Sequence, residues 1–231
     1  MQLESCFKTF LTEVMKGTDL DLLPESRFKS NKSDFYISEI NSIIEIKSIS
    51  SDRYDALEPW LNNKIKNRSE LKNGMPIIFG TIPFKTFFES HSNQALFTRQ
   101  LDQLANRTIE DYIRNAKKQI HSTKLALNKQ SASGFLVILN ESYEFYDTAF
   151  VYRSIQKMLA MIIEKSPSLK IDGVIYINES QKHNKIVDVC FIHESDDIEN
   201  IEYNETLVSI GSQWAIYRGY QHIKCTTTDF E

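Results

Sequence analysis

Two short, continuous apolar segments constrain the fold of this chain more than any other feature. Residues 134–140 (GFLVILN) and 170–178 (KIDGVIYIN) carry aliphatic and β-branched side chains without the alternation of a half-exposed strand. Such runs are typical of strands that are covered on both faces of a sheet. The segment between them, residues 149–165, has the pattern of a helix. A helix between two buried strands predicts a right-handed crossover and a locally parallel sheet, and therefore an α/β fold.

Further elements are predicted upstream of these strands. Residues 3–16 carry apolar side chains at helical intervals, and Gly17 follows as a stop signal. In residues 107–127 the apolar side chains share one face of a helix of about six turns. Between residues 35 and 49, two runs rich in β-branched and aromatic residues flank a turn-like segment, which predicts a β-hairpin. A short strand is also expected around residues 26–29.

The length of 231 residues suits one large domain, 1–231. Residues 50–106 have a weaker pattern and are interpreted as an insertion on the core. Residues 179–231 are interpreted as a C-terminal extension. There, short apolar runs (IVDVCFI, LVSI and WAIY) alternate with acidic loops, which suggests extra strands or a cap.

Charge and composition exclude several classes of protein. With 27 Lys and Arg against 31 Asp and Glu, the chain has a net charge of −4, so bulk positive charge cannot hold it on nucleic acid. No stretch approaches the roughly 18 apolar residues of a membrane-spanning helix, and charged residues interrupt the N-terminus where a secretory signal needs an apolar core. The cysteines are few and widely spaced, as reduced thiols are: Cys6, Cys190 and Cys225. We therefore expect a cytoplasmic protein without a membrane partner.

The candidate chemistry lies in the predicted hairpin. Glu45 and Lys47 are two residues apart on a strand rich in isoleucine, so their side chains project to the same face. An acid and an ammonium in so apolar a strand are costly to bury unless they are paired or bind a ligand. The hairpin turn should bring Asp34 opposite residues 45–47. Two carboxylates, a strand carbonyl and water suit Mg²⁺, and such an ion beside a lysine can promote hydrolysis of a phosphodiester.

This pattern, Asp34 followed on the next strand by Glu45-Ile46-Lys47, resembles that of the PD-(D/E)xK nuclease superfamily, which has the restriction-endonuclease-like fold. The resemblance covers residues 1–140, apart from the insertion. It implies a core in the order helix, three strands, helix, strand, with a central mixed sheet flanked by helices. Here a further helix, a strand and the C-terminal segment extend that core.

The resemblance also implies a role for each residue of the motif. Asp34, Glu45 and the backbone carbonyl of Ile46 would bind Mg²⁺, with Mn²⁺ as an alternative, and Lys47 would be the catalytic lysine. Ser33 stands where the motif's name has proline, a mild departure.

Other candidate residues lie on the two helices of the implied core. Many members of the superfamily place a glutamate on the first helix near the metal, and Glu4 lies closer to the apolar stripe than Glu13 does. A solvated position on the helix surface is equally open to Glu4. Gln119 resembles the glutamine on the later helix of some members and is included among the catalytic residues, although a structural role is the favoured alternative for it. Basic residues of the same helix are candidates for contact with nucleic-acid phosphates, unless they form its solvated face. They are Arg114, Lys117, Lys118 and Lys124.

The implied function is Mg²⁺-dependent endonuclease cleavage of DNA, in restriction, phage defence or repair. RNA as substrate and cleavage from an end stay open, as does a homodimer. The alternative is a non-catalytic nucleic-acid-binding or interaction module that keeps the nuclease-like fold. A third interpretation is that Glu45 and Lys47 form a structural ion pair in an α/β protein of unrelated function.

Overall fold

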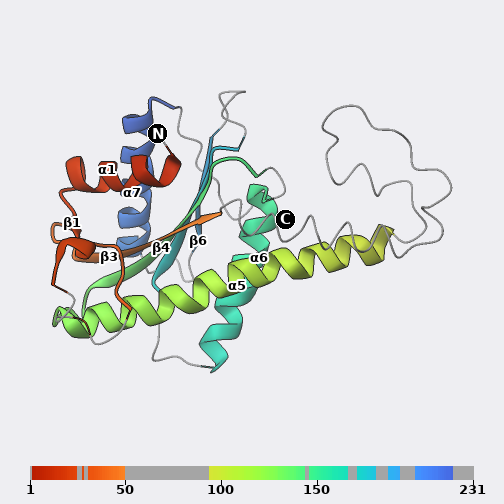
Figure 1. Ribbon diagram of the computed structural model, residues 1–231, viewed down its shortest axis with the longest axis horizontal. Helices are drawn as coiled ribbons and strands as arrows, with labels where there is room; N and C mark the ends of the chain where they lie inside the picture. The colour runs from red at the N-terminus through yellow and green to blue at the C-terminus, as the bar shows by residue number, and fades with distance from the viewer. Residues whose placement is uncertain are drawn as a thin grey trace. The chain divides into compact units, whose positions relative to one another are not determined.

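The chain folds into an α/β structure around one six-stranded sheet (Figure 1). It divides into two compact units, Met1–Ile49 with Ile109–Glu231, and Ser50–Thr108, and the sheet belongs to the first. Among the described residues, no helix has both the length and the apolar character needed to cross a membrane. The computed structural model describes residues 2–24, 28, 31–49, 94–143, 146–165, 171–180, 187–192 and 201–220.

The strands lie in the sheet in the same order as in the chain. They are β1 (Thr18–Asp19), β2 (Phe35–Ile37), β3 (Ser42–Ile49), β4 (Ser133–Asn140), β5 (Gly173–Asn178) and β6 (Asp188–Ile192). The central strands β3, β4 and β5 are parallel, while β1, β2 and β6 pair antiparallel with their neighbours. The predicted hairpin and the predicted parallel pairing of the two apolar segments are both confirmed.

Helices cover both faces of the sheet. Figure 1 shows α1 and α7 on one face and α5 and α6 on the opposite face. Helix α5 lies in the connection between the parallel strands β3 and β4, and α6 lies in the connection between the parallel strands β4 and β5. The bounds are α1 Leu3–Glu13, α5 Gln94–Ala126, α6 Thr148–Lys165 and α7 Ile201–Arg218.

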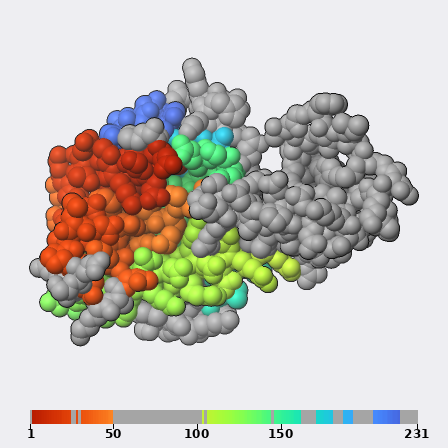
Figure 2. All heavy atoms as spheres, viewed as in Figure 1, coloured from red at the N-terminus to blue at the C-terminus, as the bar shows by residue number. Residues whose placement is uncertain are grey.

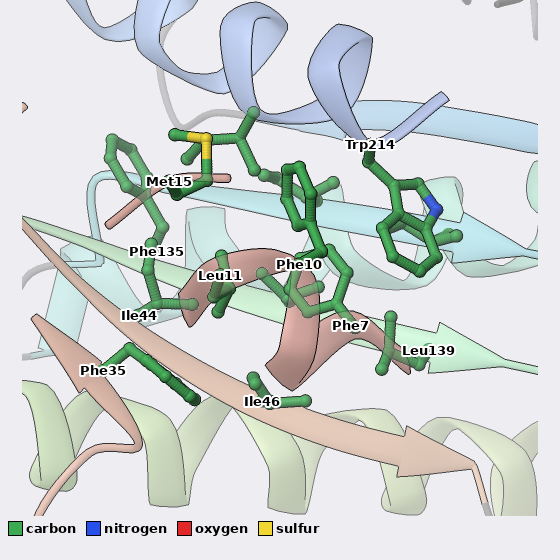
Figure 3. Packing of buried hydrophobic residues seen from close by; sticks show 14 of the residues in the cluster. Phe7, Phe10, Leu11, Met15, Phe35, Ile44, Ile46, Phe135, Leu139 and Trp214 are labelled. Carbon is green, nitrogen blue, oxygen red and sulfur yellow. The ribbon is translucent and has the colours of Figure 1, made fainter. Parts of the chain in front are cut away.

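An aromatic cluster forms the core between α1, α7 and the sheet (Figure 3). Phe7 and Phe10 of α1 meet the indole of Trp214 of α7 edge-on, with ring centroids 4.9 and 5.4 Å away. These rings are fully buried, and such side chains contribute most of the apolar burial in a core. On the sheet side, Ile44 and Ile46 of β3 belong to the same cluster.

This packing decides which way the motif residues point. Successive side chains of a strand lie on opposite faces. Because Ile44 and Ile46 face the α1 and α7 core, Glu45 and Lys47 face the side that α5 covers. The apolar residues of the strand thus act as the anchor, and the charged pair between them is turned towards a helix.

Helix α1 ends earlier than the sequence predicted. It stops at Glu13, and Val14, which was expected in the apolar stripe, is 39% exposed. The chain turns back at Lys16, which has a positive φ of 52°, and the nitrogen of Gly17 donates to Leu11 O at 2.8 Å. A Cβ on Gly17 would lie 3.1 Å from that oxygen, so the glycine permits the close return while the neighbouring lysine adopts the left-handed conformation.

The described part of the C-terminal extension contains one strand and one helix, where extra strands or a cap were expected. The run IVDVCFI contains the extra strand β6, but LVSI and WAIY lie in α7. This helix approaches β6 closely at Gly211, where a Cβ would lie 2.6 Å from Phe191 Cε1 and 2.9 Å from Val189 Cγ1. The error arose because two short apolar runs within one helix resemble separate strands when each is considered alone.

Two further boundaries differ from the sequence prediction. The first strand is Thr18–Asp19, which was not predicted, and the strand expected around residues 26–29 falls mostly outside the described residues. Helix α5 begins at Gln94, thirteen residues before position 107, within the segment interpreted as an insertion. Residues 50–93 of that segment lie outside the described part of the chain.

Candidate active site

The site lies where β3 continues beyond the end of its pairing with β2. The outermost pair of these strands matches Phe35 with Ile44, and Asp34 comes directly before β2. The backbone nitrogen of Asp34 donates to Ile44 O at 3.2 Å, and its side-chain Oδ2 accepts from Ile46 N at 2.7 Å. The carboxylate is thereby held on the edge of β3, beside the Glu-Ile-Lys segment.

Glu45 and Lys47 form a close ion pair on the α5 side of β3. Lys47 Nζ lies 2.5 Å from Glu45 Oε1, and the two side chains are 23% and 1% exposed. Gln119 of α5 accepts a second hydrogen bond from Lys47 Nζ at 3.2 Å and donates from Nε2 to Lys32 O at 3.0 Å. The structure therefore places Gln119 in contact with the motif lysine.

The surroundings of Glu45 disfavour its charged form. Burial, and next the charge of Asp34, raise the pKa of Glu45 from 4.5 to about 7, although Lys47 acts in the opposite direction. Burial likewise raises the pKa of Asp34, against the hydrogen bond from Ile46. Oε2 of Glu45 is buried without a hydrogen bond of normal geometry among the described residues, and the Ser33 hydroxyl has only a small effect on the carboxylate. A bound cation would stabilise the ionised form of such a group.

Glu4 reaches the same end of β3 from α1. Its Oε2 accepts from the Ser48 hydroxyl at 2.7 Å, and its Oε1 lies 3.0 Å from Lys8 Nζ. The same ammonium is 3.9 Å from Asp34 Oδ1. Burial alone would raise the pKa of Glu4, but the hydrogen bonds from Ser48 and Lys8 outweigh it and lower that pKa. Glu4 is thus connected to Asp34 through Lys8.

The site combines three parts of the chain that are distant in sequence. In Figure 2 the red N-terminal segment, the orange atoms of the hairpin and the yellow-green atoms of α5 adjoin on the face shown. Sequence reasoning missed three residues here: Lys8, Ser48 and Tyr112, whose hydroxyl donates to Ser48 O at 2.7 Å. Only Lys8 had a detectable signal, because it follows Glu4 by one helical turn.

The basic residues proposed for phosphate contact separate into two groups. Lys117 is 8% exposed, and Lys124 forms an ion pair with Asp172 at 3.3 Å that ties α5 to the segment before β5. Burial and this ion pair suit a structural role for these two residues, and their contact with phosphates stays a prediction. Lys118 and Arg114 are exposed, and Arg114 is paired with Glu110 on its own helix.

The residues that could hold a divalent ion are two acids and one carbonyl. Within the described residues, no group of three or more histidine, cysteine or acidic side chains is arranged to hold a metal. The oxygens of Asp34 and Glu45, with the carbonyl of Ile46, nevertheless form a hard donor set of the kind that Mg²⁺ prefers. The structural observation that fits an added cation is the buried Oε2 of Glu45, which lacks a hydrogen bond of normal geometry within the described part of the chain.

Comparisons with protein-family models, with curated proteins and with solved structures found no match for this chain. The function of the protein is therefore inferred from the geometry of the site. That geometry consists of a carboxylate fixed on a strand edge, a buried acid with a raised pKa, and a lysine held between that acid and a glutamine.

Proposed function

We propose that the protein is a Mg²⁺-dependent nuclease of the PD-(D/E)xK type, which hydrolyses phosphodiester bonds in DNA. The observation that carries this proposal is the hydrogen bond from Ile46 N to the Asp34 carboxylate, at 2.7 Å. It holds the acid of one strand beside the acid and the lysine of the next. The order α1, β1, β2, β3, α5, β4 supports the proposal, because it matches the helix, three strands, helix and strand of a restriction-endonuclease-like core.

The proposed ion binds at Asp34, Glu45 and the carbonyl of Ile46. When bound, it would supply a Lewis acid for a phosphoryl oxygen and lower the pKa of an attacking water. The protein's own contribution is to hold the two carboxylates in place beside the motif lysine. Asp34 is oriented by the main chain of β3, and Glu45 is shielded from solvent.

Lys47 and Gln119 have the positions needed to act on the reacting groups. In the reaction the oxygen of water bonds to phosphorus and gives up a proton, the bond from phosphorus to the leaving sugar oxygen breaks, and that oxygen takes up a proton. An ammonium stabilises the negative charge that builds up on the phosphoryl oxygens and can orient the water. Gln119 keeps Lys47 directed into the site through its bond at 3.2 Å.

The exposed residues Arg114 and Lys118 on α5 are the proposed contacts to the phosphate backbone. To contact phosphate, Arg114 would exchange its ion pairs with Glu110 and Asp111 for the phosphate oxygens. Contacts of this kind make nucleic-acid binding dependent on salt but carry no sequence information. The sequence preference, if there is one, would have to arise elsewhere in the chain.

The test is cleavage of plasmid and oligonucleotide DNA, with RNA alongside, in Mg²⁺ or Mn²⁺. We expect Glu45→Ala and Lys47→Ala to reduce cleavage by about 100-fold or more. Glu39→Ala, in the turn between β2 and β3, and Lys157→Ala, on the exposed side of α6, are matched controls and should cleave normally. Circular dichroism of every variant separates loss of activity from loss of fold.

Two results would count against the proposal. Cleavage that survives both Glu45→Ala and Lys47→Ala would reject this site. Salt-dependent DNA binding by the wild type without any cleavage would favour the non-catalytic binding module instead. The exposure of Lys47 and Asp34, 23% and 21% of their side chains, is what favours the enzyme, because a reacting group must reach solvent and substrate.

A further inference from the structure

Lys8 is a charged residue of the site that the motif does not include. It lies one helical turn after Glu4 on α1, so the two side chains share a face of the helix. Its Nζ is 3.0 Å from Glu4 Oε1 and 3.9 Å from Asp34 Oδ1. One ammonium therefore links α1 to the residue that begins the hairpin.

The two carboxylates around Lys8 are oriented by other bonds. Glu4 uses its second oxygen to accept from the Ser48 hydroxyl, and Asp34 uses its second oxygen to accept from Ile46 N. The remaining oxygen of each acid lies close to Lys8. Two acids fixed in this way, each with one oxygen near the same ammonium, offer the carboxylate oxygens that a hard cation also uses as ligands.

We propose that Lys8 permanently fills the position of a second cation, between Glu4 and Asp34, and that the protein consequently binds a single divalent ion. This inference rests on the proposed function, because the single ion is the one assigned to Asp34 and Glu45. Lys8 is then a positioning residue: it supplies the second positive charge of the site and keeps Asp34 directed towards the bound ion.

The local charge supports one ion rather than two. Glu4, Asp34 and Glu45 stand beside the ammonium groups of Lys8 and Lys47, which leaves one net negative charge when all five are ionised. Asp21 also acts on Asp34 and Lys8, but it is paired with Lys32 at 3.4 Å and the two charges cancel. One divalent ion turns that charge positive, and a second would add two further charges beside the two lysines. Removing the charge of Lys8 changes this balance in favour of a second ion.

The position of Lys8 is also reachable from solvent. The side chains of Lys8, Glu4 and Asp34 are 35%, 42% and 21% exposed. An ion from solution can therefore enter once the ammonium is gone, without opening of the core.

The experiment counts Mn²⁺ ions bound per full-length chain by electron paramagnetic resonance, without nucleic acid. We expect one ion for the wild type, two for Lys8→Met and for Lys8→Gln, and one for Lys8→Arg, which keeps the charge. Lys16→Met is the matched control, because Lys16 is an exposed lysine just after α1 whose Nζ bonds to Glu13 O; it should bind one ion. Circular dichroism confirms that each variant is folded.

The outcomes separate this inference from the proposed function. One ion in the wild type and still one in folded Lys8→Met and Lys8→Gln would overturn the role of Lys8 and leave the proposed metal site standing. Two ions in the wild type would also overturn it. A wild type that binds no Mn²⁺, or whose ion is unaffected by Glu45→Gln, would overturn both the proposed metal site and this inference.

Discussion

The carboxylate of Asp34 accepts a hydrogen bond from the backbone nitrogen of Ile46 at 2.7 Å. Ile46 itself is buried in the core between α1, α7 and the sheet. The position of a candidate metal ligand is thus coupled to the packing of a core strand. This coupling explains how an acid just before a strand of only three residues can be held in place.

Replacing Asp34 should separate its structural role from its chemical role. Asp34→Asn keeps an acceptor oxygen for Ile46 N and should change the free energy of unfolding by less than about 1 kcal/mol. Asp34→Ala leaves the N–H group of Ile46 without this acceptor and should lower the free energy of unfolding by about 1–3 kcal/mol. Urea unfolding in EDTA measures the difference, and both variants should lose Mn²⁺ binding alike. Equal stability of the two variants would show that this hydrogen bond does not stabilise the fold.

Glu45 should make the metal-free protein less stable as the pH rises. Because burial and the charge of Asp34 raise the pKa of Glu45 from 4.5 to about 7, the folded state holds this proton more tightly than the unfolded chain does. The protonated Glu45 therefore contributes fully to the free energy of unfolding below pH 4.5, and this contribution is lost as the pH rises to about 7. The shift corresponds to roughly 3 kcal/mol.

The measurement compares the wild type with Glu45→Gln by urea unfolding in EDTA, at about pH 4 and about pH 8. Glutamine keeps the shape of the side chain and cannot ionise. We expect the variant to match the wild type at the lower pH and to be the more stable at the higher pH. A difference between the two proteins that is the same at both values would contradict the prediction.

Gly134 should be intolerant of even a methyl group. It begins the buried part of β4, and a Cβ there would overlap Cγ2 of Ile120 on α5. Gly134→Ala should therefore lower the free energy of unfolding by about 1–3 kcal/mol through overpacking. Ile120→Ala removes the overlapping atom. In a double-mutant cycle, the double variant should therefore lose less free energy of unfolding than the sum of the losses of the two single variants. Losses of free energy that are strictly additive would refute the contact.

Because Gln119 is the neighbour of Ile120, DNA cleavage by Gly134→Ala should also be reduced.

The ion pair between Glu179, which follows β5, and Arg218 of α7 should make a large contribution to the stability of the fold. Glu179 is fully buried, and the guanidinium contacts both of its oxygens, at 3.1 Å from Nε and 2.6 Å from Nη2. Arg218→Met leaves the buried carboxylate of Glu179 without its cation and should lower the free energy of unfolding by about 3–5 kcal/mol. Glu179→Gln with Arg218→Met should recover part of this loss in thermal and urea unfolding. If Arg218→Met lowers the free energy of unfolding by less than about 1 kcal/mol, this ion pair stabilises the fold no more than a surface pair does.

The centre of the fold follows from the local pattern of residues. The continuous apolar runs of β4 and β5 and the β-branched hairpin of β2 and β3 contain enough signal to predict both the strands and the parallel pairing. The two-residue strand β1 contains no such signal, because Thr18 and Asp19 become a strand only by pairing with β2. The helical form of LVSI and WAIY was decided by the packing of α7 on β6 at Gly211.

For the site, the sequence by itself determined the motif: strand alternation puts Glu45 and Lys47 on one face, and the hairpin predicts that Asp34 lies near them. Only the tertiary structure decided which residues from elsewhere complete it. Gln119 meets Lys47 because α5 crosses β3 at that point, and Lys8 lies beside Asp34 because α1 packs over the same strand end. The physical reason is that these contacts depend on how closely whole helices approach the sheet, and that distance is set by side-chain packing between elements far apart in the chain.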